Sequence, residues 1–166
     1  MIKQTLTHFA SSMADTSLCQ ACLDRYERIS HSNSALRVLA YHRIDRRHPE
    51  SNLYPGLISC SPEMFAQQLD MLQRHTQVVS LEDVIQSVTG TAQLPERAVL
   101  LTFDDATRDF GKYAWPELKK RNLPAVLFVP TAYPDQAGLH FWWDRLYQAI
   151  MKSPDGTKIP ARENTI

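Results

Sequence analysis

The chain has 166 residues, a length typical of one domain, and 43% of them are hydrophobic, which excludes a disordered chain. Its 18 basic and 18 acidic residues give zero formal charge, so the basic footprint of a nucleic-acid binder is absent. No apolar run is long enough to span a bilayer, and residues 1–30 lack the continuous apolar segment of a secretory signal. The expected location is therefore the cytoplasm.

The N-terminal segment, residues 1–34, is predicted to form a helical arm and linker, since apolar residues recur at helix-like intervals from Leu6 to Cys22. Cys19 and Cys22 have the C-x-x-C spacing of zinc and redox sites. With three cysteines in the chain and no second matching pair, two small side chains on one helix face are the favoured interpretation. A metal or redox module remains the alternative.

Strands and helices are predicted to alternate over a domain at 35–152, before a polar tail at 153–166. The expected strands are residues 37–42, 77–80, 98–103 and 125–129. The expected helices begin at Ser61-Pro62, after Ser80, after Asp105 and at Phe141, and Pro116 is expected to restart the third of them near Trp115. This alternation predicts an α/β fold with about four parallel strands.

The most informative feature is the pair Asp104-Asp105, which follows the apolar run Ala98–Phe103. His42 also follows a predicted strand, and ligand sites of parallel α/β folds lie at the carboxyl ends of strands. Adjacent carboxylates disfavour joint ionisation unless a cation or donor compensates, so a metal ligand beside a proton acceptor is one interpretation. A solvated acidic turn that opens the next helix is the other.

Two further acidic sites fit less well. A phosphatase of the haloacid dehalogenase type needs Asp-x-Asp, and Ala106 stands where its second carboxylate would be. A receiver domain needs a phospho-acceptor Asp on a later strand, but the strand at 125–129 continues into Pro130-Thr131. Metal-dependent hydrolysis is the remaining chemistry.

Several segments, in the same order, resemble the polysaccharide deacetylase family (the NodB-homology domain, carbohydrate esterase family 4). They are residues 38–44, 61–69, 79–83, the Thr-Phe-Asp-Asp motif at 102–105, and 113–131, within a similarity over roughly 36–150. The resemblance implies the N-terminal part of an irregular (β/α) barrel. It also implies a hydrolase that removes N-acetyl groups from amino-sugar polymers.

The resemblance further implies roles for individual residues. Asp104 would be the general base that takes a proton from water, and Asp105 would bind a divalent metal, zinc in most of the family. His42 is a second metal-ligand candidate because it ends the first strand. His48 and His140 are interpreted as surface residues, and Trp142 and Trp143 as core residues in preference to a sugar groove.

The chain departs from the family pattern at two points. Ala106 stands where the family has Gly, and the family's His-x-x-x-His metal motif is absent from the sequence. We therefore expect a truncated domain that is inactive alone, with an open sheet edge. The alternative function is a non-catalytic half-barrel that completes its sheet through a partner or by self-association.

Overall fold

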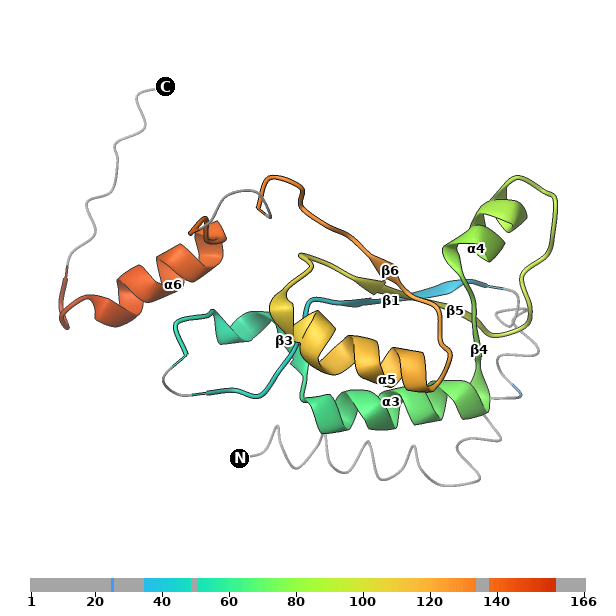
Figure 1. Cartoon of the computed structure of the whole chain (residues 1–166), viewed down its shortest axis with the longest axis horizontal. Coiled ribbons are helices and arrows are strands. Elements are labelled where there is room, and N and C mark those ends of the chain that lie inside the picture. The colour runs from blue at the N-terminus through green and yellow to red at the C-terminus, as the bar shows by residue number, and fades with distance from the viewer. Residues whose placement is uncertain (1–24, 26–34, 49–50, 134–137, 158–166) are drawn as a thin grey trace.

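The computed structural model describes residue 25 and residues 35–48, 51–133 and 138–157. In chain order the elements are β1 (Arg37–Tyr41), β2 (Arg43–Ile44), the 3₁₀ helix η2 (Pro55–Leu57), β3 (Ile58–Cys60), α3 (Pro62–His75), β4 (Gln77–Val78), α4 (Leu81–Val88), β5 (Ala98–Phe103), the π-helix η3 (Phe110–Ala114), α5 (Trp115–Lys120), β6 (Val126–Leu127) and α6 (Trp142–Lys152) (Figure 1). The predicted N-terminal arm, with Cys19 and Cys22, lies outside the described residues except for Arg25.

Strand β5 lies at the centre of a parallel sheet of four strands (Figure 1). It pairs with β1 along its length, from Arg37 opposite Val99 to Tyr41 opposite Phe103. On its other edge, β4 pairs with the start of β5 and β6 with its end. The α/β class and the four predicted strands are therefore confirmed.

A second, smaller parallel sheet joins β2 to β3, with Arg43 opposite Ile58 and Ile44 opposite Cys60. The sequence did not predict it, because strands of two and three residues are too short to display an alternating pattern. One residue, His42, separates β2 from β1. The second sheet therefore begins at the carboxyl edge of the first.

Helices α3 and α4 begin where the sequence predicted. The Ser61 hydroxyl accepts a hydrogen bond from the Met64 N–H, and Pro62 occupies the first helical turn. In α4, Ser80 and Asp83 form a reciprocal capping box. These caps satisfy N–H groups that have no partner within the helix.

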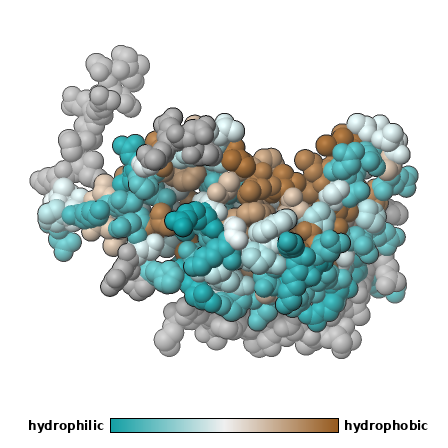
Figure 2. All heavy atoms as spheres, viewed as in Figure 1, coloured by the Kyte–Doolittle hydropathy of each residue, from teal (hydrophilic) through white to brown (hydrophobic). Residues whose placement is uncertain are grey.

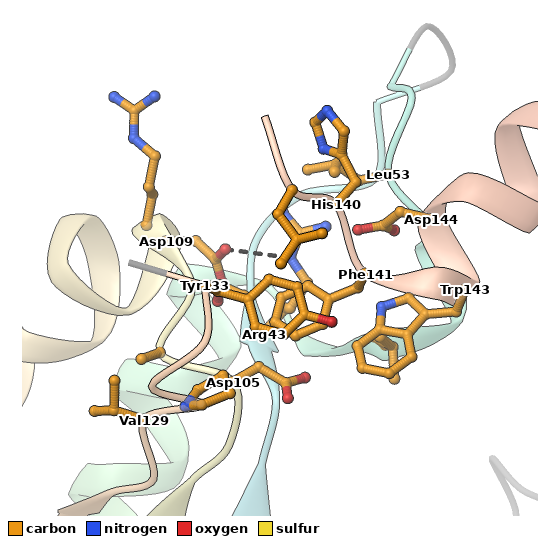
Figure 3. A pocket seen from close by; sticks show the side chains of 16 residues that line it. Arg43, Leu53, Asp105, Asp109, Val129, Tyr133, His140, Phe141, Trp143 and Asp144 are labelled. Carbon is orange, nitrogen blue, oxygen red and sulfur yellow. Dashed lines mark hydrogen bonds and ion pairs between the residues drawn. The ribbon is translucent and has the colours of Figure 1, made fainter. Parts of the chain in front are cut away.

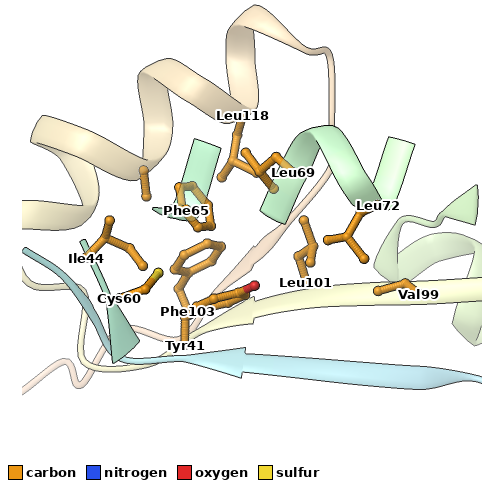
Figure 4. Packing of buried hydrophobic residues seen from close by; sticks show 11 residues of the cluster. Tyr41, Ile44, Cys60, Phe65, Leu69, Leu72, Val99, Leu101, Phe103 and Leu118 are labelled. Atoms are coloured by element: carbon orange, nitrogen blue, oxygen red, sulfur yellow. The ribbon is translucent and has the colours of Figure 1, made fainter. Parts of the chain in front are cut away.

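The main core lies between the sheet and helices α3 and α5 (Figure 4). Alternate residues of β5 point into it, and the Phe103 ring packs edge-on against Phe65 at 5.8 Å and stacks on Tyr41 at 5.3 Å. Its buried residues are Tyr41, Ile44, Cys60, Phe65, Leu69, Leu72, Val99, Leu101, Phe103, Ala114 and Leu118. All six residues of β5 are buried, as predicted for a strand covered on both faces.

The helix after β5 changes its winding part-way. Residues Phe110–Ala114 form a π-helix, in which the Trp115 N–H donates to the Phe110 carbonyl five residues earlier. The α-helical winding of α5 then begins at Trp115, as Pro116 predicted, because proline has no N–H to donate.

The opposite face of the sheet is covered over only part of its area. Ala98, Leu100 and Val79 form a small buried cluster against Val84 of α4. Elsewhere large apolar side chains stay in water, including Val38 at 53% and Phe128 at 54% exposure. Figure 2 shows apolar residues gathered in the hollow between α6 and α4.

Helix α6 lies apart from the four-stranded sheet (Figure 1). Asp144 is its buried residue, whereas Trp142 is 65% exposed. The interpretation of Trp142 as a core residue is therefore wrong, because the helix extends beyond the sheet that would bury it. No helix in the described part of the chain has both the length and the apolar character needed to cross a membrane.

Candidate active site

The parallel register of β1 and β5 brings two of the predicted site residues together. Tyr41 lies opposite Phe103, so the next residues, His42 and Asp104, emerge side by side at the carboxyl edge. The Asp104 N–H donates to the Tyr41 carbonyl at 2.9 Å. The His42 Nε2 lies 3.9 Å from the Asp104 Oδ2, and both side chains are partly exposed, at 40% and 36%. Asp104 is therefore accessible to water and within ion-pair distance of an imidazole.

Asp105 and Ala106 form a tight turn with left-handed backbone, at φ values of 69° and 47°. Such angles are unfavourable for residues with a Cβ, and Ala gains no hydrogen bond from its side chain there. Gly, which has no Cβ, would adopt the backbone angle at position 106 without this strain. The Asp105 side chain lines a neighbouring cavity (Figure 3).

Burial raises the pKa of the Asp105 carboxyl above its ordinary value. The nearby His42 opposes this rise, whereas the charges of Asp104 and Asp144 add to it. The adjacent carboxylates therefore have different surroundings: Asp104 lies toward water and Asp105 lines the cavity. Different surroundings are what two separate roles in proton transfer and ligand binding require.

The cavity has a volume of about 450 Å³ and lies between the loop after β5, the segment after β6 and the start of α6 (Figure 3). Neither Asp104 nor His42 lines it. The lining residues are Arg43, Leu53, Leu57, Asp105, Ala106, Thr107, Arg108, Asp109, Val129, Pro130, Tyr133, Leu139, His140, Phe141, Trp143 and Asp144.

A buried ion pair holds the loop after β5 against β2. The Arg43 Nε donates to the Asp109 Oδ1 at 3.2 Å, and the Ile44 N–H donates to the Asp109 Oδ2 at 2.9 Å. Arg43 also contacts the Asp45 carboxylate at 3.3 Å. Both ends of the turn that carries Asp105 are thus fixed, one by β5 and the other by Asp109.

The opposite wall is aromatic and acidic. The Phe141 ring stacks on Tyr133 at 4.2 Å and on Trp143 at 4.6 Å. Asp144 is 7% exposed, and its Oδ1 accepts the Tyr54 N–H at 2.7 Å. Sequence reasoning missed Asp109 and Asp144, because neither belongs to a motif, and only the tertiary structure places them beside Asp105.

The other histidines have distinct surroundings. His48 is exposed and lies 4.0 Å from Asp45, consistent with a surface residue. His140 is also exposed, but it lines the cavity. Within the described ranges, no three His, Cys, Asp or Glu side chains are grouped closely enough to hold a metal ion. A catalytic zinc commonly has three protein ligands, so these residues do not by themselves complete a zinc site.

Comparisons with known proteins find similar polysaccharide N-deacetylases. No protein-family profile matches the chain. A poly-β-1,6-N-acetyl-D-glucosamine N-deacetylase from Staphylococcus epidermidis is 30% identical over 126 residues, which are 70% of this chain and 41% of that protein. The chain corresponds to part of a polysaccharide deacetylase domain.

Two solved structures support the assignment of the partial deacetylase fold. A de-N-acetylase from Aggregatibacter actinomycetemcomitans is 26% identical, with a TM-score of 0.53 over 70% of this chain and 50% of that one. The Streptococcus pyogenes deacetylase PplD, solved with acetate, is 28% identical, with a TM-score of 0.54 over 69% of this chain and 52% of that one. The chain spans about half or less of the length of these relatives.

Proposed function

We propose that residues 35–152 contribute the two catalytic carboxylates of a hydrolase that removes N-acetyl groups from an amino-sugar polymer. The observation that carries the proposal is the Asp104-Asp105 pair at the carboxyl end of β5, with one carboxylate toward water and one in an adjacent cavity. The similarity to three deacetylases supports the same chemistry.

In the proposed reaction, Asp104 accepts a proton from the attacking water as the water oxygen adds to the acetyl carbon. The C–N bond then breaks, acetate leaves, and the sugar nitrogen takes up the proton to become an amine. The His42 Nε2 lies 3.9 Å from the Asp104 Oδ2, so the two side chains flank the same position at the carboxyl edge of the sheet. General-base catalysis of this kind contributes about 10²–10⁴-fold to a rate.

A divalent metal, zinc in our proposal, would polarise the acetyl carbonyl and lower the pKa of water. Asp105 and His42 are the ligands that this chain offers, which is fewer than the three of a usual catalytic zinc site. We therefore expect no acetate release from the 166-residue chain alone. We propose metal dependence and activity for a domain in which further residues supply the remaining ligands.

The test is a hybrid enzyme in which residues 36–150 replace the matching part of the S. pyogenes deacetylase. We expect the folded hybrid to release acetate from N-acetylglucosamine oligomers, and Asp104→Asn to slow it at least about 100-fold while metal stays bound. Asp105→Asn should weaken metal binding. Asp70→Asn, a partly exposed acid of α3, is the matched control and should change neither property.

Two outcomes would contradict the proposal. A folded, metal-loaded hybrid that releases no acetate would remove the deacetylase assignment. Full activity in the Asp104→Asn hybrid would contradict the assignment of Asp104 as the general base, whereas the assignment of the reaction as deacetylation would still stand.

The second candidate is self-association through the open face of the sheet, and a specific observation favours it. Val38 and Phe128 are more than half exposed, although large apolar side chains on a sheet face usually pack against another layer. Sedimentation velocity of the chain should then show a dimer, and Phe128→Asp should shift it to a monomer. A wild-type monomer at all concentrations would remove this candidate.

A further inference from the structure

We infer that the cavity beside Asp105 binds an amino-sugar unit whose nitrogen is already a free ammonium, in preference to an N-acetylated or neutral sugar. This inference rests on the proposed function and names the part of the substrate that this cavity would hold. Three observations carry it: a continuous aromatic wall, a buried carboxylate without a cationic partner, and an arginine whose charge is already compensated.

The aromatic wall suits the apolar face of a sugar ring. The Phe141 ring is nearly parallel to Trp143, at an interplanar angle of 8°, and to Tyr133, at 25°. In this stack Phe141 is covered by Tyr133 and Trp143, so the ring edges and the remaining faces of Tyr133 and Trp143 supply the apolar surface, which needs no hydrogen bonds from its ligand. Figure 3 shows the three rings, Asp105 and Asp144 around the same cavity.

Asp144 is the anionic group that would meet an ammonium. It is buried, and the Tyr54 N–H is its hydrogen-bond donor among the described residues. An ionised carboxylate has about four lone-pair positions, so most of its accepting capacity is unused. Burying such a group without a cation is costly, and a bound ammonium would compensate it.

The cationic side chains at the wall do not fill this role. Arg43 is already bonded to two carboxylates, Asp109 and Asp45. Arg108 and His140 are exposed residues, and no ion pair joins either of them to Asp144 within the described part of the chain. The acid of the aromatic wall therefore lacks compensation that a ligand cation would provide. An N-acetyl group is neutral and would leave this charge uncompensated.

This arrangement has a consequence for the polymer. Asp104 does not line the cavity and Asp144 belongs to the wall opposite Asp105, so the unit whose nitrogen meets Asp144 would be a neighbour of the unit that reacts at Asp104 and Asp105. A site that favours an ammonium there would act best on a polymer that already carries some free amines. Reactions that deacetylate the first units would then supply its preferred substrate.

The experiment is a calorimetric titration of the 166-residue chain, at a pH below the pKa of the sugar amine and at physiological salt. Three β-1,6-linked tetrasaccharides are compared: glucosamine, N-acetylglucosamine and glucose. We expect the glucosamine tetramer to bind at least tenfold more tightly than the other two. Tenfold is about the effect of one hydrogen bond to a charged group.

Variants separate the charge from the aromatic wall. Asp144→Asn keeps an acceptor for the Tyr54 N–H and should remove the preference for glucosamine, while Trp143→Ala should weaken all three ligands. Trp115→Ala and Asp155→Asn alter a tryptophan and an aspartate that do not line the cavity, and should change nothing. Circular dichroism of each variant verifies that it is folded.

Three results would overturn the inference: equal affinity for the glucosamine and N-acetylglucosamine tetramers, an unchanged preference in folded Asp144→Asn, or no binding of any tetramer. The titration involves no hydrolysis, so its outcome is independent of the deacetylase test. An active hybrid without this preference would overturn the inference alone, and a clear preference without hydrolysis would overturn only the proposed reaction.

Discussion

Replacing Asp109 with alanine should destabilise the fold far more than replacing an exposed acid. The Asp109 carboxylate binds the Arg43 guanidinium and the Ile44 N–H, and both charged side chains are less than 10% exposed. Removing one partner of a buried ion pair costs about 3–5 kcal/mol, because the other charge stays buried without compensation. Asp45 still contacts Arg43, so we expect the lower end, about 3 kcal/mol of unfolding free energy.

Urea unfolding, followed by circular dichroism, measures this loss. Asp109→Asn retains an acceptor for the Ile44 N–H and loses only the charge, so it should cost less than Asp109→Ala. The control is Glu63→Ala, which removes the partner of Arg46 from a pair whose side chains are 56% and 51% exposed. Exposed pairs contribute about 0–1 kcal/mol.

A double-mutant cycle with Arg43→Met tests whether the pair itself is responsible. If the buried charge is the cause, Asp109→Ala should cost much less in an Arg43→Met background, with a coupling above about 1 kcal/mol. A loss below 1 kcal/mol for Asp109→Ala alone, or additive single changes, would refute the reasoning. The loop after β5 would then be held by other contacts.

The remaining predictions concern the turn and the core. Ala106→Gly should stabilise the chain by about 1 kcal/mol because it relieves a left-handed backbone. Ala149→Gly, in an exposed part of α6, should instead cost about 1 kcal/mol. If both substitutions shift the thermal unfolding temperature in the same direction, this reasoning is contradicted. Burial raises the pKa of Tyr41 to about 12. The stability that Tyr41 contributes is therefore full below its unfolded pKa of about 10 and is lost as the pH rises through 12. The difference in absorbance between the wild type and Tyr41→Phe, followed as the pH is raised, should show that the Tyr41 hydroxyl ionises near pH 12. A difference centred near pH 10 would exclude the raised pKa. Phe103→Ala should cost about 3–5 kcal/mol in urea unfolding, and a loss below 1 kcal/mol would show that the aromatic core is not well packed.

Local sequence signals predicted the main elements because they coincide with the tertiary contacts. Ala98–Phe103 is apolar at every position, and every position is buried. Pro116 predicted the restart of the helix at Trp115 because a missing N–H has the same effect in any tertiary setting. The β2–β3 sheet could not be predicted from the sequence, because the pairing of these two short strands depends on the path of residues 51–57, which lead into β3.

For the site, the sequence predicted the position of the carboxylates but not their surroundings. The ends of β1 and β5 were expected to meet, and the register places His42 beside Asp104. Asp144 is 39 positions after Asp105 and belongs to no motif, so its place at the cavity depends on the path of the chain after β6. Whether Asp104, Asp105 and His42 have the predicted catalytic and metal-binding roles remains a prediction.

The π-helix at Phe110–Ala114 makes this part of the chain tolerant of a larger side chain at Gly111 and intolerant of length changes. A π turn is equivalent to one residue inserted into an α-helix. A Cβ at Gly111 would meet no atom within 4 Å, so Gly111→Ala adds bulk without a clash. Deleting Gly111 would instead restore α-helical winding and rotate everything before it by about 100°. Asp109 would then turn away from Arg43, so homologous chains should keep this segment's length more strictly than the glycine at position 111.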